Sequence, residues 1–279
     1  MQTETKDDYF EKGKPTHRIS YCAFMDVLGF SAQISESFDN NRGDKLLRKF
    51  HAILSERISE MEKEQDDTLL YFKSFTDNVI LAHPRFSPDL ESEFGFILDS
   101  ILEFQFRMAL AGFFIRGGLS IGPLFMDENS VYGPALLEAY DLESKKAVNP
   151  AVVLSDDVMG LVLKHLKFYA SIEIAPQNRH VWINDEGRFF LNYLTGCVWE
   201  TDEGDEINWI SLKKHKKLIE RCLDQYRSIP SVFGKYVWLA SYHNEFCKSV
   251  SDFPGYTSAV RVRSGKLKFK FRRLSEIGL

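Results

Sequence analysis

The stretch Tyr21-Cys22-Ala23-Phe24-Met25-Asp26-Val27-Leu28-Gly29-Phe30-Ser31 is an apolar run with a single carboxylate, and it ends in a glycine turn. The run predicts a buried β-strand followed by a turn. A carboxylate inside such a strand is costly to bury unless it is paired or bound to a metal ion. Asp26 is therefore the first candidate for a functional residue.

A second apolar run, from Leu69 to Leu81, places Asp77 at a predicted hairpin turn between two strands. Two carboxylates brought together by adjacent strands repel each other unless a divalent cation lies between them, and such oxygen ligands suit Mg²⁺ or Mn²⁺. A simpler interpretation is that Asp77 and Asn78 form only a polar turn. No turn explains Asp26, so the metal-site interpretation is favoured.

Size and composition set broad limits. The chain of 279 residues can form one large domain or one domain with an appendage. Its 44% hydrophobic and 27% charged residues are typical of a soluble globular protein, and its net charge of −5 provides no general basic field, so no nucleic-acid partner is expected. The four cysteines have no CxxC spacing, which indicates free thiols in a reducing compartment.

No segment indicates a membrane partner. Residues 1–20 are charged and polar, and no later run approaches about 18 uninterrupted apolar residues. We therefore expect a cytoplasmic protein, with a flexible N-terminal tail over residues 1–18.

The first half of the chain alternates strand and helix signals. Strands are predicted at 21–27, 69–81, 113–122 and 151–155, and helices at about 31–63 with a break near 40–44, at 90–111 and at 136–142. This order predicts an α+β fold in which helices pack on one face of a mainly antiparallel sheet.

The second half is less regular. It predicts a hairpin over 181–194, helices over 211–227 and 233–249, and a strand in the tail 261–273 with Leu267, Phe269 and Phe271 buried. Trp238, Tyr242 and His243 share one helical face, which indicates a packing seam rather than a site.

Several motifs resemble class III nucleotidyl cyclases in the order of that family, over about residues 21–155. Phe24 to Ser31 resembles the first metal-site motif, and Lys73-Ser74-Phe75-Thr76-Asp77 resembles the second. Arg116 with Gly118 and Gly122 is similar to the strand whose arginine meets the triphosphate, and Tyr132 to Glu143 is similar to the start of the catalytic helix.

Within that family the sequence of these motifs resembles that of the pyrimidine cyclases of the bacterial anti-phage system Pycsar. The similar strings are Ser74 to Asn78, Arg116 to Gly118, Gly133 to Glu143, and Lys235 to Trp238 with Tyr242 to Asn244. The resemblance implies a class III cyclase-like catalytic domain over residues 19–170 and a C-terminal α/β extension over 171–279 that packs on the core.

The resemblance also implies roles for individual residues. Asp26 and Asp77 would bind two Mn²⁺ or Mg²⁺ ions, with the carbonyl of Val27 as an extra ligand. Backbone N–H groups at a turn are anion donors, and the phosphates would be held by Gly29, Phe30 and Ser31.

Three further positions concern the triphosphate and the base. Arg116 would neutralise the triphosphate, although a pair with a buried carboxylate is the simpler role. Lys73, from the other protomer of a homodimer, would read the base, although a strand lysine can also extend its head group at a sheet edge. Ser130 stands where the family has a base-reading aspartate.

The sequence departs from adenylate and guanylate cyclases on the catalytic helix. Leu137 and Asp141 stand where those enzymes have an asparagine and the transition-state arginine. Adenine specificity is therefore not expected. The missing cation could be Lys145, Lys146 or one in the basic tail, and the sequence does not choose among them.

The function implied is a homodimeric pyrimidine cyclase that converts UTP to 3′,5′-cyclic UMP and pyrophosphate for a separate anti-phage effector protein. A cytidylate cyclase and a catalytically inactive nucleotide-binding module are the alternatives. A metal-dependent phosphohydrolase or nuclease is a further class, although His83 is the only histidine near a motif.

Overall fold

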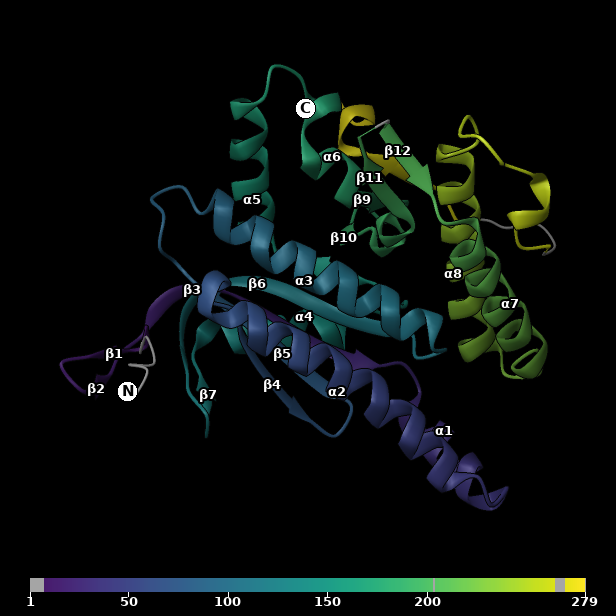
Figure 1. The fold of residues 1–279 in the computed structure, drawn as a ribbon, viewed down its shortest axis with the longest axis horizontal. Coiled ribbons are helices and arrows are strands. Elements are labelled where there is room, and N and C mark those ends of the chain that lie inside the picture. The colour runs from purple at the N-terminus through teal and green to yellow at the C-terminus, as the bar shows by residue number, and fades with distance from the viewer. Residues whose placement is uncertain (1–7, 203, 264–268, 279) are drawn as a thin grey trace.

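The computed structural model describes residues 8–202, 204–263 and 269–278 (Figure 1). Its strands are β1 (Phe10–Glu11), β2 (Lys14–Pro15), β3 (Arg18–Val27), β4 (Tyr71–Phe75), β5 (Asn78–Pro84), β6 (Ile115–Met126), β7 (Val131–Tyr132), β8 (Val152–Leu154), β9 (Val181–Asn184), β10 (Phe189–Leu191), β11 (Val198–Thr201), β12 (Gly204–Ile207) and β13 (Phe271–Arg273). Its α-helices are α1 (Phe30–Asp39), α2 (Gly43–Thr68), α3 (Glu91–Leu110), α4 (Pro134–Lys145), α5 (Asp156–His165), α6 (Pro176–His180), α7 (Trp209–Gln225) and α8 (Pro230–Ser249).

One large sheet organises the chain. Its strand order is β13-β9-β10-β8-β6-β3-β5-β4, with β7 paired to β6. Strand pairs are antiparallel except for β6 with β8, which is parallel. The long apolar strands β3 and β6 lie side by side at its centre. The predicted α+β fold with a mainly antiparallel sheet is confirmed.

Helices cover both faces of this sheet, so the prediction of helices on one face was wrong. Tyr21 and alternate residues of β3 face α3, where the ring of Tyr21 lies 5.7 Å from that of Phe94. The other face of β3 packs against α4, where Phe24 meets Tyr140 at 5.4 Å. Helix α4 approaches closely because Gly118 of β6 has no side chain: a Cβ there would overlap the Ala139 carbonyl oxygen.

The C-terminal half continues the same sheet. Phe190 of β10 pairs with Val153 of β8, and β9 and β13 follow outward. Helices α7 and α8 pack against each other at one end of the molecule (Figure 1). The sheet therefore crosses the boundary predicted between 170 and 171, and the division into a catalytic domain and an extension stays a prediction.

Among the described residues of the tail, 261–263 and 269–278, only Phe271–Arg273 forms a paired strand. Phe271 is buried as expected, Phe269 is half-buried, and Leu267 lies outside the described residues. Residues 261–263 are not in a strand, because the side chain of Asn244 binds both the N–H and the carbonyl of Val262.

The structure of residues 8–18 differs from the predicted flexible tail over residues 1–18. They contain the β1–β2 hairpin and the start of β3. Tyr9 is buried, its hydroxyl lies 2.9 Å from Ser20 Oγ, and its ring packs on Tyr71 at 4.9 Å. Burial of this aromatic side chain ties the segment to the sheet.

Helices α7 and α8 enclose a chain of neutral polar groups. The Tyr193 hydroxyl lies 2.8 Å from His215 Nε2, His215 Nδ1 lies 2.9 Å from His243 Nδ1, and His243 Nε2 lies 2.9 Å from the Val260 carbonyl. The carbonyl can only accept, so the proton positions follow: Nε2–H of His243 donates to Val260, His215 donates from Nδ1, and Tyr193 donates to His215. Trp238, Tyr242 and His243 are buried in this region, which confirms the predicted packing seam.

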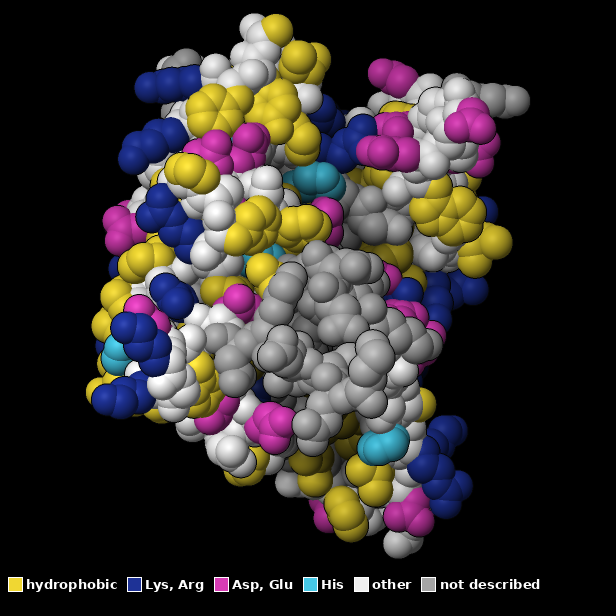
Figure 2. Space-filling view, turned by 60° about the vertical axis from the view of Figure 1, so that its left-hand side comes forward, with side chains coloured by type: hydrophobic (Ala, Val, Ile, Leu, Met, Phe, Trp, Pro, Cys, Tyr) yellow, Lys and Arg dark blue, Asp and Glu magenta, His cyan; other side chains and the backbone are white. Residues whose placement is uncertain are grey.

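The surface and the thiols fit the composition. On the face shown in Figure 2, Lys and Arg side chains are interspersed with Asp and Glu rather than gathered in one basic surface. Cys22, Cys197, Cys222 and Cys247 are free. Within residues 8–202, 204–263 and 269–278, no helix has the length and apolar character that crossing a membrane requires.

Candidate active site

Asp26 and Asp77 meet at a cavity of about 410 Å³ on the α4 side of the sheet. It is lined by Phe24, Asp26, Val27, Gly29, Phe30, Ser31, Asp77, Asn78, Arg116, Tyr140 and Glu143. The predicted metal and phosphate residues are thus brought together in one place, although they come from three separate segments of the chain.

The strand register explains why the two carboxylates converge. Met25 pairs with Val79, so Asp26 and Asn78 are the next positions along β3 and β5. Thr76 has a φ of 57°, a left-handed conformation that closes the tight β4–β5 turn. Asp77 follows it directly and lies beside Asp26.

The proximity of Asp77 changes the chemistry of Asp26. Partial burial, a hydrogen bond with the Asp77 carboxyl and the charge of Asp77 together raise the pKa of Asp26 to about 7, against the lowering effect of Arg116. A carboxyl with this pKa is partly protonated near neutral pH. A bound cation would replace that proton.

Arg116 lies directly opposite Asp26 in the β3–β6 register. Its Nη2 is 3.2 Å from Asp26 Oδ2 and 2.7 Å from Glu143 Oε1. Arg116 therefore pairs with carboxylates, one of them buried, as the simpler prediction held. It also lines the cavity, where its remaining N–H groups can meet a phosphate.

Glu143 of α4 is a site residue to which the sequence analysis gave no role. It is 4% exposed, and burial raises its pKa although the charge of Arg116 lowers it. A signal for it was present: Glu143 continues the buried stripe of Ala135 and Ala139 at a spacing of four residues. A carboxylate on the core-facing stripe of a helix needs a cation or hydrogen-bond donors opposite it.

The turn after β3 provides backbone donors. Gly29 has a φ of 70°, and α1 begins at Phe30 with no side-chain cap and no acidic residue in its first turn. The N–H groups at such a helix start are without intrahelical partners and attract anions. Gly29, Phe30 and Ser31 all line the cavity, as a phosphate cradle requires.

The donor set fits a hard divalent cation. Asp26, Asp77 and the backbone at Val27 offer oxygen atoms at one end of the cavity, as Mg²⁺ and Mn²⁺ prefer. Among the described residues, no group of three or more His, Cys, Asp or Glu side chains is arranged to hold a metal ion. An ion here would therefore take its remaining ligands from the backbone, water or a phosphate.

Lys73 and Ser130, the two predicted base-reading residues, do not line this cavity. They meet instead around Asp127: Lys73 Nζ donates to its carbonyl oxygen at 3.1 Å, and Ser130 donates to its Oδ1 from the backbone at 2.6 Å. The two predicted base-reading positions are therefore adjacent to each other but separate from the carboxylate pair within one chain.

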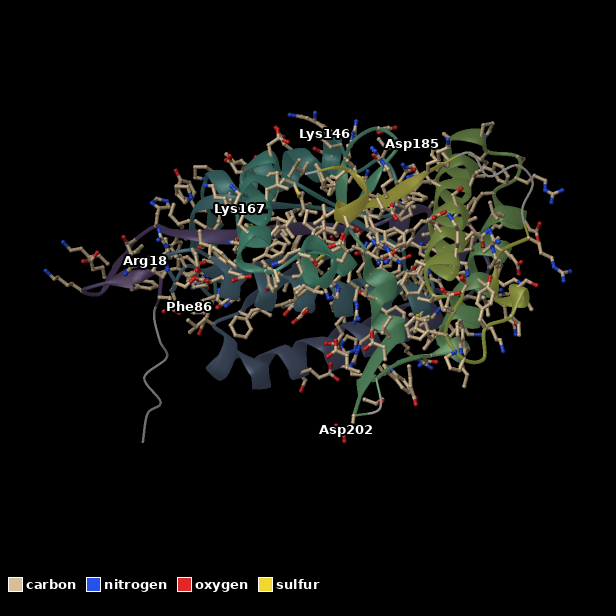
Figure 3. The ribbon with its side chains drawn as sticks, turned by 90° about the horizontal axis from the view of Figure 1, so that it is seen from above. Arg18, Phe86, Lys146, Lys167, Asp185 and Asp202 are labelled. Atoms are coloured by element: carbon tan, nitrogen blue, oxygen red, sulfur yellow. The ribbon has the colours of Figure 1, made fainter. Side chains whose placement is uncertain are left out.

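The candidate replacement cations lie elsewhere. Lys145 forms an exposed pair with Asp141 at 2.7 Å, and Lys146 is exposed at the outer surface (Figure 3). His83 is buried, stacked on Phe96 at 5.6 Å, and outside the cavity lining. A metal-dependent hydrolase would gain nothing from a histidine in that position.

Comparison with solved structures gives matches to class III cyclases. The adenylyl cyclase CyaB from P. aeruginosa is 16% identical, with 53% of this chain and 82% of that chain covered and a TM-score of 0.41. The guanylate cyclase domain of RhGC from Catenaria anguillulae in complex with GTP is 18% identical, with 62% and 96% covered and a TM-score of 0.40. A class III adenylyl cyclase-like ATP-binding protein from Pseudomonas aeruginosa is 14% identical, with 57% and 37% covered and a TM-score of 0.44.

These likenesses concern the fold alone. No protein-family model and no curated protein matches the sequence. The chemistry must therefore be argued from the cavity itself.

Proposed function

We propose that this chain is a nucleotidyl cyclase that converts UTP to 3′,5′-cyclic UMP and pyrophosphate. The observation that carries the proposal is the convergence of Asp26 and Asp77 in one cavity with Arg116 and the start of α1. Such a cavity combines a place for divalent ions with donors for a polyphosphate, which is what phosphoryl chemistry on a nucleoside triphosphate requires.

In the proposed reaction the ribose 3′-oxygen attacks the α-phosphorus, and the bond from that phosphorus to the bridging oxygen of pyrophosphate breaks. The 3′-hydroxyl proton leaves to solvent and pyrophosphate departs with the bond electrons. Two Mg²⁺ or Mn²⁺ ions held by Asp26, Asp77 and the Val27 carbonyl would acidify the 3′-hydroxyl and neutralise the phosphates.

The chain itself would hold the substrate. N–H groups of Gly29, Phe30 and Ser31 would bind phosphate oxygens, and Arg116 would neutralise the triphosphate while Glu143 holds its guanidinium in place. Lys73 and Ser130 would face the base in the site of a partner protomer, because they lie away from their own carboxylate pair.

A homodimer is part of this proposal. Exposed apolar side chains lie at the end of β4, on β7 and on α4: Phe75 is 78%, Tyr132 68% and Leu137 69% exposed. A second copy that covers these side chains would bury them and bring its own Lys73 to the cavity. Leu137→Asp should shift the protein from dimer to monomer in sedimentation velocity, whereas the matched change Ile210→Asp, at an 80% exposed side chain of α7, should not.

The base and the biological role rest on the resemblance to Pycsar pyrimidine cyclases. That resemblance supports UTP, or CTP as the alternative, and a cytoplasmic role in which a separate effector protein senses the product in anti-phage defence. Leu137, exposed at the position of the family's asparagine, also suits the alternative of an inactive nucleotide-binding module.

The test is incubation of the protein with Mn²⁺ and each of ATP, GTP, CTP and UTP, with products identified by mass spectrometry. Cyclic UMP should form, and Asp26→Ala and Asp77→Ala should abolish it, while Asp185→Ala, in the distant β9–β10 turn, should not. Formation of cyclic CMP instead would identify CTP as the substrate. Nucleotide binding without a cyclic product would favour the inactive module, and hydrolysis to a linear monophosphate would favour a phosphohydrolase.

A further inference from the structure

Helix α8 brings a lysine from the C-terminal half of the chain towards the carboxylate cavity. Tyr236 of α8 is buried, and its ring lies 5.8 Å from the ring of Phe114. Phe114 comes two residues before Arg116, just ahead of β6, so α8 packs beside the end of β6 that carries Arg116. Lys235 precedes Tyr236 on α8 and is not among the residues that line the cavity.

The charge of Lys235 interacts with those of Arg116, Asp26 and Glu143, the groups that face it from β6, β3 and α4. Its side chain is half-buried, and that desolvation lowers its pKa. Within the part of the chain that the structure describes, no carboxylate lies within ion-pair distance of its Nζ. By contrast Lys248, on the same helix, pairs with Glu245 at 3.1 Å in solvent.

The charges around the cavity show what Lys235 adds. Three carboxylates, those of Asp26, Asp77 and Glu143, face Arg116, whose charge is already shared between two of them. Because these carboxylates offset part of the positive charge of Arg116, a polyphosphate in the cavity would gain from a second cation beside it. The charge of Lys235 interacts with this group of side chains, but its ammonium forms no ion pair with any carboxylate among them. The ammonium therefore remains available to bind a phosphate.

We propose that Lys235 is a second phosphate-binding cation of this site, supplied by the same chain and directed at the polyphosphate of the substrate. The proposal deepens the proposed function and rests on it for the location of the triphosphate. It assigns to the C-terminal half a direct part in the site, and to α8 the positioning of that charge.

The test measures binding of inorganic tripolyphosphate with Mn²⁺ by titration calorimetry, together with the melting temperature of each variant. Lys235→Met keeps the apolar stem and should weaken binding about tenfold, because a charge-assisted contact is lost. Lys235→Arg should bind within about threefold of the wild type, since the charge is restored. Lys248→Met is the matched control and should bind like the wild type.

Wild-type affinity in a folded Lys235→Met variant would overturn the proposal, and so would an equal loss in Lys248→Met. Should Lys235→Met not fold, Lys235→Gln replaces it in the same measurement. The two proposals fail separately: tripolyphosphate binding that depends on Lys235, with no cyclic product from any nucleotide, would refute only the cyclase activity.

Discussion

Asp26 and Arg116 occupy directly opposed positions on β3 and β6, with Arg116 Nη2 3.2 Å from Asp26 Oδ2. The same nitrogen lies 2.7 Å from the buried Glu143 carboxylate. Arg116 is therefore part of the folded core's charge balance before any ligand binds. Its loss should affect stability as well as function.

Arg116→Met should lower the free energy of unfolding by about 2–4 kcal/mol, because it leaves the Glu143 carboxylate buried without its cation. Adding Glu143→Gln should restore part of this loss, since the uncompensated charge is removed as well. Urea unfolding of the two single variants and the double variant measures the coupling. A double variant less stable than Arg116→Met alone would contradict the pairing.

Asp26→Asn should stabilise the metal-free protein by about 1 kcal/mol above pH 7. The pKa of Asp26 is raised from 3.8 to about 7 in the fold, so its cost is absent below pH 3.8 and complete above about 7. The gain should therefore grow as the pH rises through this window. Chemical denaturation of both proteins at pH 5 and pH 8 tests the sign.

The same carboxyl should couple metal binding to pH. Cations bind the deprotonated carboxylate, so the rise in melting temperature caused by Mn²⁺ should increase as the pH rises through about 7. Asp26→Asn and Asp77→Asn should abolish this rise at every pH. An undiminished Mn²⁺ effect in both variants would place the ion elsewhere.

Mild acid should destabilise the α7–α8 region. Burial lowers the pKa of His243 from 6.5 to about 4 and that of His215 well below 6.5, so both are neutral in the fold. Stability should be complete above pH 6.5 and decline, by roughly 2–3 kcal/mol for His243, as the pH falls towards 4. Protonation of Asp26 stabilises the fold as the pH falls, which opposes the effect of the histidines. Urea unfolding is therefore measured in the Asp26→Asn background, where this contribution is absent. His243→Gln should flatten the profile, and an unchanged slope would refute this account.

The close approach of α4 to the sheet should make Gly118 intolerant of a side chain. A Cβ there would overlap the Ala139 carbonyl oxygen and the Leu142 side chain, so Gly118→Ala should cost about 1–3 kcal/mol and displace Glu143 from Arg116. Gly95, inside α3, has nothing within 4 Å of an added Cβ. Gly95→Ala should be neutral or stabilise by up to about 1 kcal/mol. Thermal unfolding of both variants makes the comparison.

The sequence predicted the elements whose signals are local. Period and turn residues located β3, the Asp77 hairpin, α3 and α8, and the buried carboxylate of Asp26 marked the site. The sequence did not predict helices on both faces of the sheet. The packing of α4 on the second face depends on the absence of a side chain at Gly118, which the hydrophobic periodicity does not show.

Long-range contacts were also beyond the sequence pattern. The approach of α8 to Arg116 joins segments more than a hundred residues apart, and the order of strands around β8 joins β6, β8 and β10 across the helices that separate them in the chain. Glu143 was visible as a carboxylate on a core-facing stripe, but its partner could be identified only from the β3–β6 register. Tyr9 carried no periodic signal at all, because a single aromatic anchor holds its segment.

Strand β10 pairs with β8, whose outer side would otherwise be an unpaired edge of the sheet. Val152–Leu154 of β8 lies between β6 and β10, and removal of the residues after 170 would expose its unpaired N–H and C=O groups beside buried valines. Such a border is a template for pairing with other chains. A fragment trimmed to residues 19–170 should therefore aggregate. The later strands prevent self-association through β8, in addition to supporting the site.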